Sequence, residues 1–276
     1  MLTRRLRLLG FTAAVSACGS PAHQSEAKAP PVVTVTAREY AFDAPDSIEA
    51  GPTTFRLVSK GREEHFVGLV RIAAPHTVEE FKRTLTSSAP TPWISGVGGV
   101  GTLEPGGTGT TTLDLPPGLY AMLCDMEDPH GTPHMLEGMV HALKVLPTHN
   151  GATMPAADDT ITLADYAFSL SAPLGPGDHV IEVKNLGPQP HMVLIWRLHP
   201  GKSAGDILRW MKQSTDSGTP ITLDGGTPDL APGLSAQLVV HLEESHYALI
   251  CLVDDVHDHQ PHFVHGMLSE IAVQQR

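Results

Sequence analysis

The sequence predicts an all-β protein made of two tandem copies of one antiparallel Greek-key β-sandwich domain, each with one short inserted helix. Three observations lead to this prediction: an internal repeat, short segments in which apolar and polar residues alternate, and turns marked by Pro-Gly pairs. With 276 residues, 41% of them hydrophobic and 17% charged, the chain can form two cores and does not have a disordered composition. A net charge of −12 argues against nucleic acid as a partner.

The internal repeat sets the number of domains. Matching residues are separated by 126 positions early in each half, then by 127 and finally by 128, as single-residue loop insertions would produce. The matches include Tyr40-Ala41-Phe42 with Tyr166-Ala167-Phe168, His65 with His191, Cys124 with Cys251, and Met139 with Met267. The repeat predicts a first domain over residues 32–147 and a second over residues 159–276. Residues 148–158 are the predicted linker, because Pro, Thr, Ala and Gly dominate this stretch.

Local patterns predict the strands and helices. Alternating apolar and polar residues predict strands at residues 32–37, 54–58, 110–115 and 119–123. Each domain should also contain one helix at the same place. In the first domain, a capping box formed by Thr77 and Glu80 precedes a face with Val78, Phe81 and Leu85. In the second, Ser203 and Asp206 cap a segment in which the side chains of Ile207, Trp210 and Met211 should point inward.

Residues 1–18 have the pattern of an export signal. Three arginines precede a short apolar core, which ends in Val15-Ser16-Ala17-Cys18. This ending resembles the lipobox of bacterial lipoproteins, which implies cleavage before Cys18 and lipidation of its thiol. An ordinary secretory signal cleaved nearby is the alternative. We therefore expect residues 19–31 to be a flexible tether, the membrane to be a partner through the lipid, and the protein to lie on the periplasmic or cell-surface side.

The other two cysteines occur once in each domain, at equivalent positions. Neither domain can form an internal disulfide, and a bridge between Cys124 and Cys251 would require equivalent points of the two domains to meet closely. A metal is one way to protect an unpaired thiol in an exported protein. Each cysteine is preceded by one histidine and followed by a histidine and a methionine. The candidate ligands are His65, Cys124, His134 and Met139 in the first domain, and His191, Cys251, His262 and Met267 in the second.

Two imidazoles and a thiolate with a weak axial thioether form the blue-copper ligand set. The motifs Tyr120-x-x-x-Cys124…His134-x4-Met139 and Tyr247-x-x-x-Cys251…His262-x4-Met267 resemble the C-terminal signature of the cupredoxins, the plastocyanin-like blue copper domains. The resemblance covers both domains. It implies a copper cofactor held by the eight candidate ligands, and an electron carrier that meets a redox partner protein. A copper-buffering protein and a metal-free interaction module on the same fold are the alternatives.

The segments between the cysteines and the second histidines depart from the cupredoxin pattern. Nine residues separate Cys124 from His134 and ten separate Cys251 from His262, which is longer than in familiar cupredoxins. These segments are acidic and carry possible alternative ligands, namely His130, His257 and His259. Two-domain multicopper oxidases need His-x-His pairs and a His-Cys-His step, and only His257-Asp258-His259 imitates such a pair. The sequence therefore leads us to expect that the protein is not an enzyme.

Overall fold

The computed structural model describes residues 27–87, 91–213 and 218–275, and this part of the chain is all-β with two short α-helices, as predicted. The elements of the first half are β1 (Val32–Arg38), β2 (Ala41–Asp43), β3 (Ser47–Ser59), β4 (His65–Ile72), α1 (Val78–Thr84), β5 (Ile94–Leu103), β6 (Thr108–Leu115), β7 (Gly118–Leu123) and β8 (Val140–His149). Those of the second half are β9 (Asp159–Ala164), β10 (Ala167–Leu170), β11 (Gly177–Asn185), β12 (His191–Leu198), α2 (Ala204–Gln213), β13 (Ile221–Leu230), β14 (Ser235–Leu242), β15 (Ser245–Ile250), the 3-10 helix η1 (His262–His265) and β16 (Leu268–Val273).

The predicted signal over residues 1–18, its Cys18 and most of the predicted tether lie outside the described residues. The described end of that tether makes contacts, because the Lys28 ammonium donates to the Asn150 carbonyl at 2.6 Å. Strand β8 continues to His149, two residues past the boundary expected for the first domain. Among the described helices, none has the length and apolar character needed to cross a membrane.

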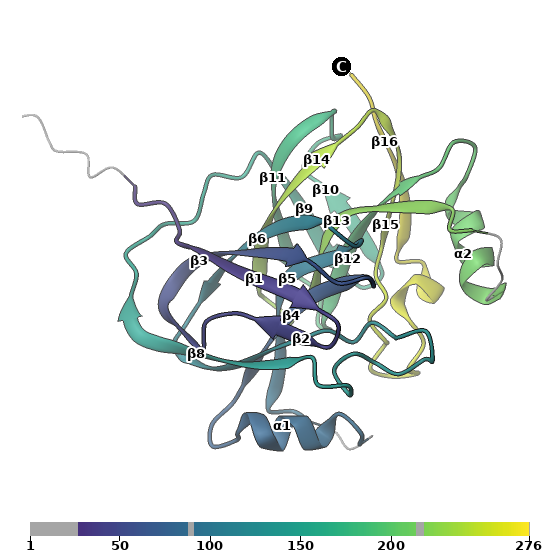
Figure 1. Ribbon diagram of the computed structural model, residues 1–276. Helices are drawn as coiled ribbons and strands as arrows, with labels where there is room; N and C mark the ends of the chain where they lie inside the picture. The colour runs from purple at the N-terminus through teal and green to yellow at the C-terminus, as the bar shows by residue number, and fades with distance from the viewer. Residues whose placement is uncertain (1–26, 88–90, 214–217, 276) are drawn as a thin grey trace, which may run out of the picture.

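Each half is a two-layer β-sandwich (Figure 1). In the first half β1, β3 and β6 form one layer, and β8, β7, β4 and β5 form the other. The second half repeats this arrangement, with β9, β11 and β14 facing β13, β12, β15 and β16. The sandwiches differ from the expected antiparallel arrangement, because β1 pairs in parallel with β3, β3 with β8, and β9 with β11. In each half, the intervening short strand reverses the chain and a further turn reverses it again.

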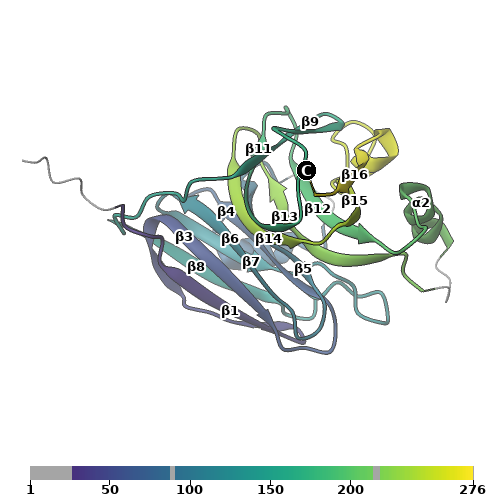
Figure 2. The ribbon, with the colours of Figure 1, turned by 90° about the horizontal axis from the view of Figure 1, so that it is seen from above.

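The two halves join through equivalent strands. Strand β5 pairs antiparallel with β13, and β6 pairs antiparallel with β14, so that each layer continues from one half into the other (Figure 2). In the second pairing Thr111 lies opposite Leu238, which is its own counterpart at the offset of 127. When two equivalent strands pair antiparallel with equivalent residues opposite each other, the two strands are related by a two-fold rotation. The two halves are therefore related by an approximate two-fold axis.

Both helices begin at the predicted residues. Thr77 Oγ1 accepts from the Glu80 amide at 3.1 Å, and Glu80 Oε2 accepts from the Thr77 amide at 2.8 Å, which completes the capping box. At α2 the Ser203 amide and hydroxyl both donate to the Asp206 carboxylate. Ile207 is buried and Met211 packs against the same apolar cluster, as expected. Trp210 is half-buried and lies outside that cluster, so the expectation that it points inward is wrong.

Replacing Thr77 by alanine should lower the free energy of unfolding by about 1 kcal/mol, because the hydroxyl oxygen that satisfies the Glu80 amide is lost. Urea denaturation followed by circular dichroism measures the change. Lys82→Ala is the control in the same helix, at an exposed position. It should stay within about 0.5 kcal/mol of the parent. Equal stability of Thr77→Ala and Lys82→Ala would contradict the role of the cap.

Candidate metal centres

The strand order brings the first histidine and the cysteine of each domain together. His65 is the first residue of β4, and Cys124 directly follows the last residue of β7. Because β4 and β7 pair antiparallel, the start of one lies at the same end of the sheet as the end of the other. His191 at the start of β12 and Cys251 after β15 repeat this placement.

The second histidine and the methionine return to the cysteine at the end of the long connecting segment. In the first domain the Met139 amide donates to the His134 carbonyl at 3.0 Å, and the Cys124 amide donates to the Met139 carbonyl at 3.4 Å. In the second domain the same two bonds join Met267 to His262 at 3.0 Å and Cys251 to Met267 at 3.1 Å. Met139 and Met267 are fully buried, in the apolar core that also contains both cysteines.

Each domain holds a compact cluster of two imidazoles and one thiol. The potential ligand atoms of His65, Cys124 and His134 lie within 4.8 Å of one another, and those of their second-domain counterparts do so too. Cys124 Sγ lies 3.6 Å from His134 Nδ1, and Cys251 Sγ lies 3.5 Å from His262 Nδ1. All six side chains are buried with no exposed surface. Within the described ranges these are the two groups with metal-binding geometry.

The clusters contain polar atoms that protein contacts leave unsatisfied. Both ring nitrogens of His65 and the Nε2 atom of His262 are buried without a hydrogen-bond partner among the described residues. Such orphaned atoms are costly, and an ion bound by His65 would explain one of its two unsatisfied nitrogens. Burial raises the pKa of the Cys124 and Cys251 thiols to about 12, so each needs a cation to become a thiolate. A thiolate with two imidazoles suits copper or zinc. The residues present therefore fit a metal ion.

Carboxylates hold one histidine of each cluster, but not the equivalent one. In the first domain His134 Nε2 lies 2.9 Å from Glu63 Oε2. In the second domain His191 Nε2 lies 2.7 Å from Asp165 Oδ1. The other ring nitrogen, Nδ1, faces the cluster in both cases. Nδ1 of His134 faces the Cys124 sulfur. Nδ1 of His191 lies 3.0 Å from Nδ1 of His262. A carboxylate on the outer nitrogen fixes the ring orientation and increases ligand basicity.

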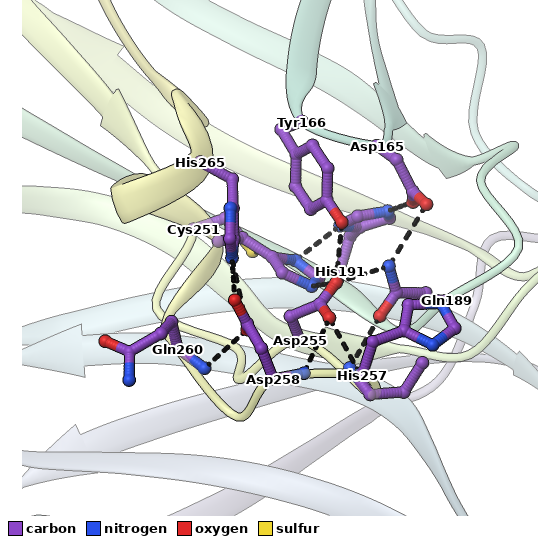
Figure 3. Close-up of polar contacts among 12 residues, drawn as sticks. Asp165, Tyr166, Gln189, His191, Cys251, Asp255, His257, Asp258, Gln260 and His265 are labelled. Atoms are coloured by element: carbon purple, nitrogen blue, oxygen red, sulfur yellow. Dashed lines mark hydrogen bonds and ion pairs between the residues drawn. The ribbon is translucent and has the colours of Figure 1, made fainter.

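A tyrosine covers each cluster from the turn that follows the first strand of the domain. The Tyr40 ring centroid lies 5.1 Å from that of His134, and the Tyr166 centroid lies 5.3 Å from that of His262. Figure 3 shows the second site, where the Tyr166 hydroxyl donates to Asp255 Oδ2 at 2.6 Å. Gln189 donates to Asp255 at 2.8 Å and to Asp165 at 3.1 Å, which links the two carboxylates. The bonds from Tyr166 and Gln189 lower the pKa of Asp255, which therefore stays ionised.

These outer residues were not predicted from the sequence. One sequence feature could have indicated Asp165. An acidic residue directly precedes the tyrosine of the Tyr-Ala-Phe motif in both copies of the repeat. Asp165 holds His191 in the second domain. Its counterpart Glu39 instead accepts hydrogen bonds from the amides of Arg62 and Glu63.

The possible alternative ligands do not join the clusters. His130, His257 and His259 are exposed, and no group with metal-binding geometry in the described residues contains them. These three histidines lie on exposed turns whose backbone amides are held by Asp128 and Asp255, while Asp255 itself is buried beside the second cluster. Asp128 Oδ1 accepts from the amides of His130 and Thr132, both at 2.8 Å, and Asp255 Oδ1 accepts from the His257 amide at 2.8 Å.

Comparisons with known proteins give distant structural likenesses. No family model and no curated protein matches the chain. Auracyanin A, a "blue" copper protein from Chloroflexus aurantiacus, is 19% identical with a TM-score of 0.31, and the match covers 42% of this chain and 99% of that one. Copper nitrite reductase from Nitrosomonas europaea is 16% identical with a TM-score of 0.28, over 90% and 95% of the two chains. A multicopper oxidase is 12% identical with a TM-score of 0.25, over 88% of each chain.

Both halves of the chain are two-layer β-sandwiches, the fold class that the sequence predicted, and each contains a His-Cys-His cluster. The expectation that the protein is not an enzyme was wrong as an exclusion. Copper nitrite reductase and multicopper oxidase are enzymes, and both are among the similar structures. The missing His-x-His pairs excluded only one kind of copper cluster, and they do not exclude enzymatic activity in general.

Proposed function

We propose that this chain is an exported, lipid-anchored copper protein that binds one copper ion in each domain and transfers electrons. The observation that carries the proposal is the duplicated, fully buried His-Cys-His cluster, in which both ring nitrogens of His65 lack a hydrogen-bond partner among the described residues. The proposed ligands are His65, Cys124, His134 and Met139 in the first domain, and His191, Cys251, His262 and Met267 in the second. Bound there, copper would supply a one-electron couple for exchange with a redox partner protein.

The side chains of the chain itself support this role in three ways. The cysteine thiol would lose its proton on metal binding and become the strongest donor. Burial lowers the pKa of His65, His191 and His262, so these three imidazoles present neutral nitrogens. The clusters are held from outside by Glu63 and Asp165. They lie at the ends of paired strands, so the ligands move little when the charge of the site changes.

Titration of the purified chain with cupric ion tests the proposal. We expect binding of two equivalents and an intense visible absorption band from thiolate-to-copper charge transfer. The melting temperature should rise, because an ion that binds only the folded state stabilises it. Copper binding without the band would favour the buffering alternative. Absence of retained copper after dialysis, with an unchanged melting temperature, would contradict every copper function.

Replacing Asp165 by asparagine should weaken copper binding about 10- to 100-fold in the second domain, because the amide no longer supplies the negative charge that orients His191. Competition with a chelator measures the affinity of each site. The matched variant Glu63→Gln should weaken the first site and leave the second unchanged. Asp178→Asn, which alters an exposed carboxylate paired with His241, is the control and should change neither. If Asp165→Asn weakened both sites equally, its role would be general rather than local.

The lipid anchor is a separate part of the proposal and has its own test. Expressed in a bacterium with its first 31 residues, the protein should partition into the detergent phase and carry an acyl mass on Cys18. Cys18→Ser should move the protein to the aqueous phase. An intact chain that is soluble and carries no acyl group would indicate an ordinary secretory signal instead.

A further inference from the structure

A cavity of about 220 Å³ lies between the two domains, and Phe66, Asp125, Met192 and Leu252 in its lining each directly follow a member of a His-Cys-His cluster in the sequence. Several lining residues of the first domain have their counterparts from the repeat in the same lining. Three such pairs are Phe66 with Met192, Asp125 with Leu252, and Thr102 with Asp229. A cavity that contains both members of several pairs lies on the approximate two-fold axis that relates the domains. The contact between the domains therefore creates this cavity, and neither sandwich contains it alone.

The two ends of the cavity have different chemistry, although the fold around them is nearly symmetric. Asp125 corresponds to Leu252 in the repeat, and Asp229 corresponds to Thr102. The negative charge of Asp125 acts on Asp229, so the two carboxylates lie near each other, one from each domain. The two-fold axis then places their counterparts Leu252 and Thr102 together at the other end. One end is acidic, and the other is uncharged.

No cation balances the acidic end. Neither Asp125 nor Asp229 has an ion-pair partner within the described ranges. Burial raises the pKa of Asp229 to about 6, and the charges of Asp125 and Asp254 raise it further. Asp229 is half-buried and Asp125 is exposed, and because no basic side chain pairs with either of them among the described residues, a positive group placed between the two carboxylates would be attracted.

The remaining walls are apolar. Phe66 presents an aromatic ring, and Met126 and Met192 are half-buried thioether side chains that adapt to the shape of a ligand. Within the described residues, no group with metal-binding geometry occurs at this cavity. An apolar chamber with carboxylates at one end matches an organic cation better than a metal ion.

We propose that the cavity between the domains binds a small organic cation, a protonated amine whose ammonium group meets Asp125 and Asp229 and whose apolar body lies toward Leu252. The volume sets its size. A cavity of about 150 Å³ accepts benzene, so the larger space here accepts an aromatic ring with a short aminoalkyl group. The site does not depend on the proposed copper function.

Calorimetric titration of the metal-free full-length chain with benzylammonium at pH 7.5 tests the proposal. Metal-free protein is used so that the amine cannot bind copper. Benzyl alcohol is the neutral probe of nearly equal shape, and benzoate is the probe of opposite charge. We expect benzylammonium to bind at least tenfold more tightly than benzyl alcohol, and benzoate not to bind. Asp229→Asn and Asp125→Asn should each weaken benzylammonium binding at least fivefold without changing the affinity for benzyl alcohol.

Asp43→Asn is the matched control, because Asp43 is an exposed carboxylate on β2 that does not line the cavity. It should bind benzylammonium like the parent. Thr102→Leu fills the uncharged end and should weaken benzylammonium and benzyl alcohol alike, which locates the ligand in the cavity. Melting curves of each variant show that it is folded. Equal affinity of benzylammonium and benzyl alcohol, or unchanged binding in both aspartate variants, would overturn the proposal.

Discussion

Replacing Cys124 by serine is expected to reduce the copper content of the protein from two equivalents to one and to remove the visible band of the first site. The thiolate is the ligand that produces the charge-transfer band, and a serine hydroxyl stays protonated and binds copper weakly. The sulfur lies 3.6 Å from His134 Nδ1 within a fully buried cluster, so no other side chain in the cluster supplies a thiolate in its place. Elemental analysis and absorption spectroscopy measure the two effects.

Matched variants separate the sites. Cys251→Ser should remove the second site and retain the first, and the double variant should bind no copper in these sites. Met122→Leu is the control. It replaces a fully buried residue of β7, the strand that ends just before Cys124, by one of similar volume, and the variant should still bind two equivalents of copper. Retention of two equivalents and an unchanged band in Cys124→Ser would disprove the assignment of the ligand.

The same thiols determine how copper binding depends on pH. With no metal bound, the pKa of each thiol is about 12, so copper must displace a proton from Cys124 and from Cys251 at any ordinary pH. The deprotonated thiol is the form that binds, and its fraction rises with pH. Affinity should therefore increase as the pH rises, by up to about tenfold per unit.

The second large effect is expected from Gly99→Ala. A Cβ atom at Gly99 would lie 2.0 Å from the carbonyl oxygen of Val67, a main-chain atom of the neighbouring strand β4 that cannot move aside. Strand β4 begins with His65, so any shift of β4 also displaces a candidate ligand. The clash, with the φ of +152° at this glycine, should lower the free energy of unfolding by about 4 kcal/mol or more. Chemical denaturation measures the stability, and copper titration measures the first site.

Its repeat counterpart should behave in the same way. A Cβ atom at Gly226 would lie 2.4 Å from the Val193 carbonyl oxygen, so Gly226→Ala should affect the second domain. Gly205→Ala is the control, because its added methyl group meets only ordinary contacts and the residue lies in α2. That variant should be about 0.5–1 kcal/mol more stable than the parent. If Gly99→Ala lost less than about 1 kcal/mol, the close approach of β5 and β4 would be contradicted.

The domain contact also depends on glycine. A Cβ atom at Gly101 would lie 2.8 Å from the Gly226 carbonyl oxygen, and one at Gly96 would lie 2.6 Å from the Asp229 carbonyl oxygen. These positions let β5 of one domain lie directly against β13 of the other. The glycine-rich character of β5 was visible in the sequence, but nothing there indicated that it serves the contact between the domains.

The amino-acid sequence by itself determined the all-β fold, the duplication, the helix that begins after Thr77, and the residues from which each cluster is built. These features follow from local signals: alternation along a strand, a capping box, and repeated residue types at nearly constant separation. Such signals depend on neighbours along the chain, and a single sequence contains them in full.

Only the tertiary structure decided which histidine of each site a carboxylate holds, where the acidic segments go, and how the domains meet. Glu63 and His134 are 71 residues apart, and Asp165 and His191 are 26 apart, so the folding of the sandwich brings each pair together. His130, His257 and His259 were plausible ligands by spacing alone. In the structure all three are exposed, and the amides of His130 and His257 donate to Asp128 and Asp255. Contacts of this kind depend on distances in space, which spacing along a chain does not specify.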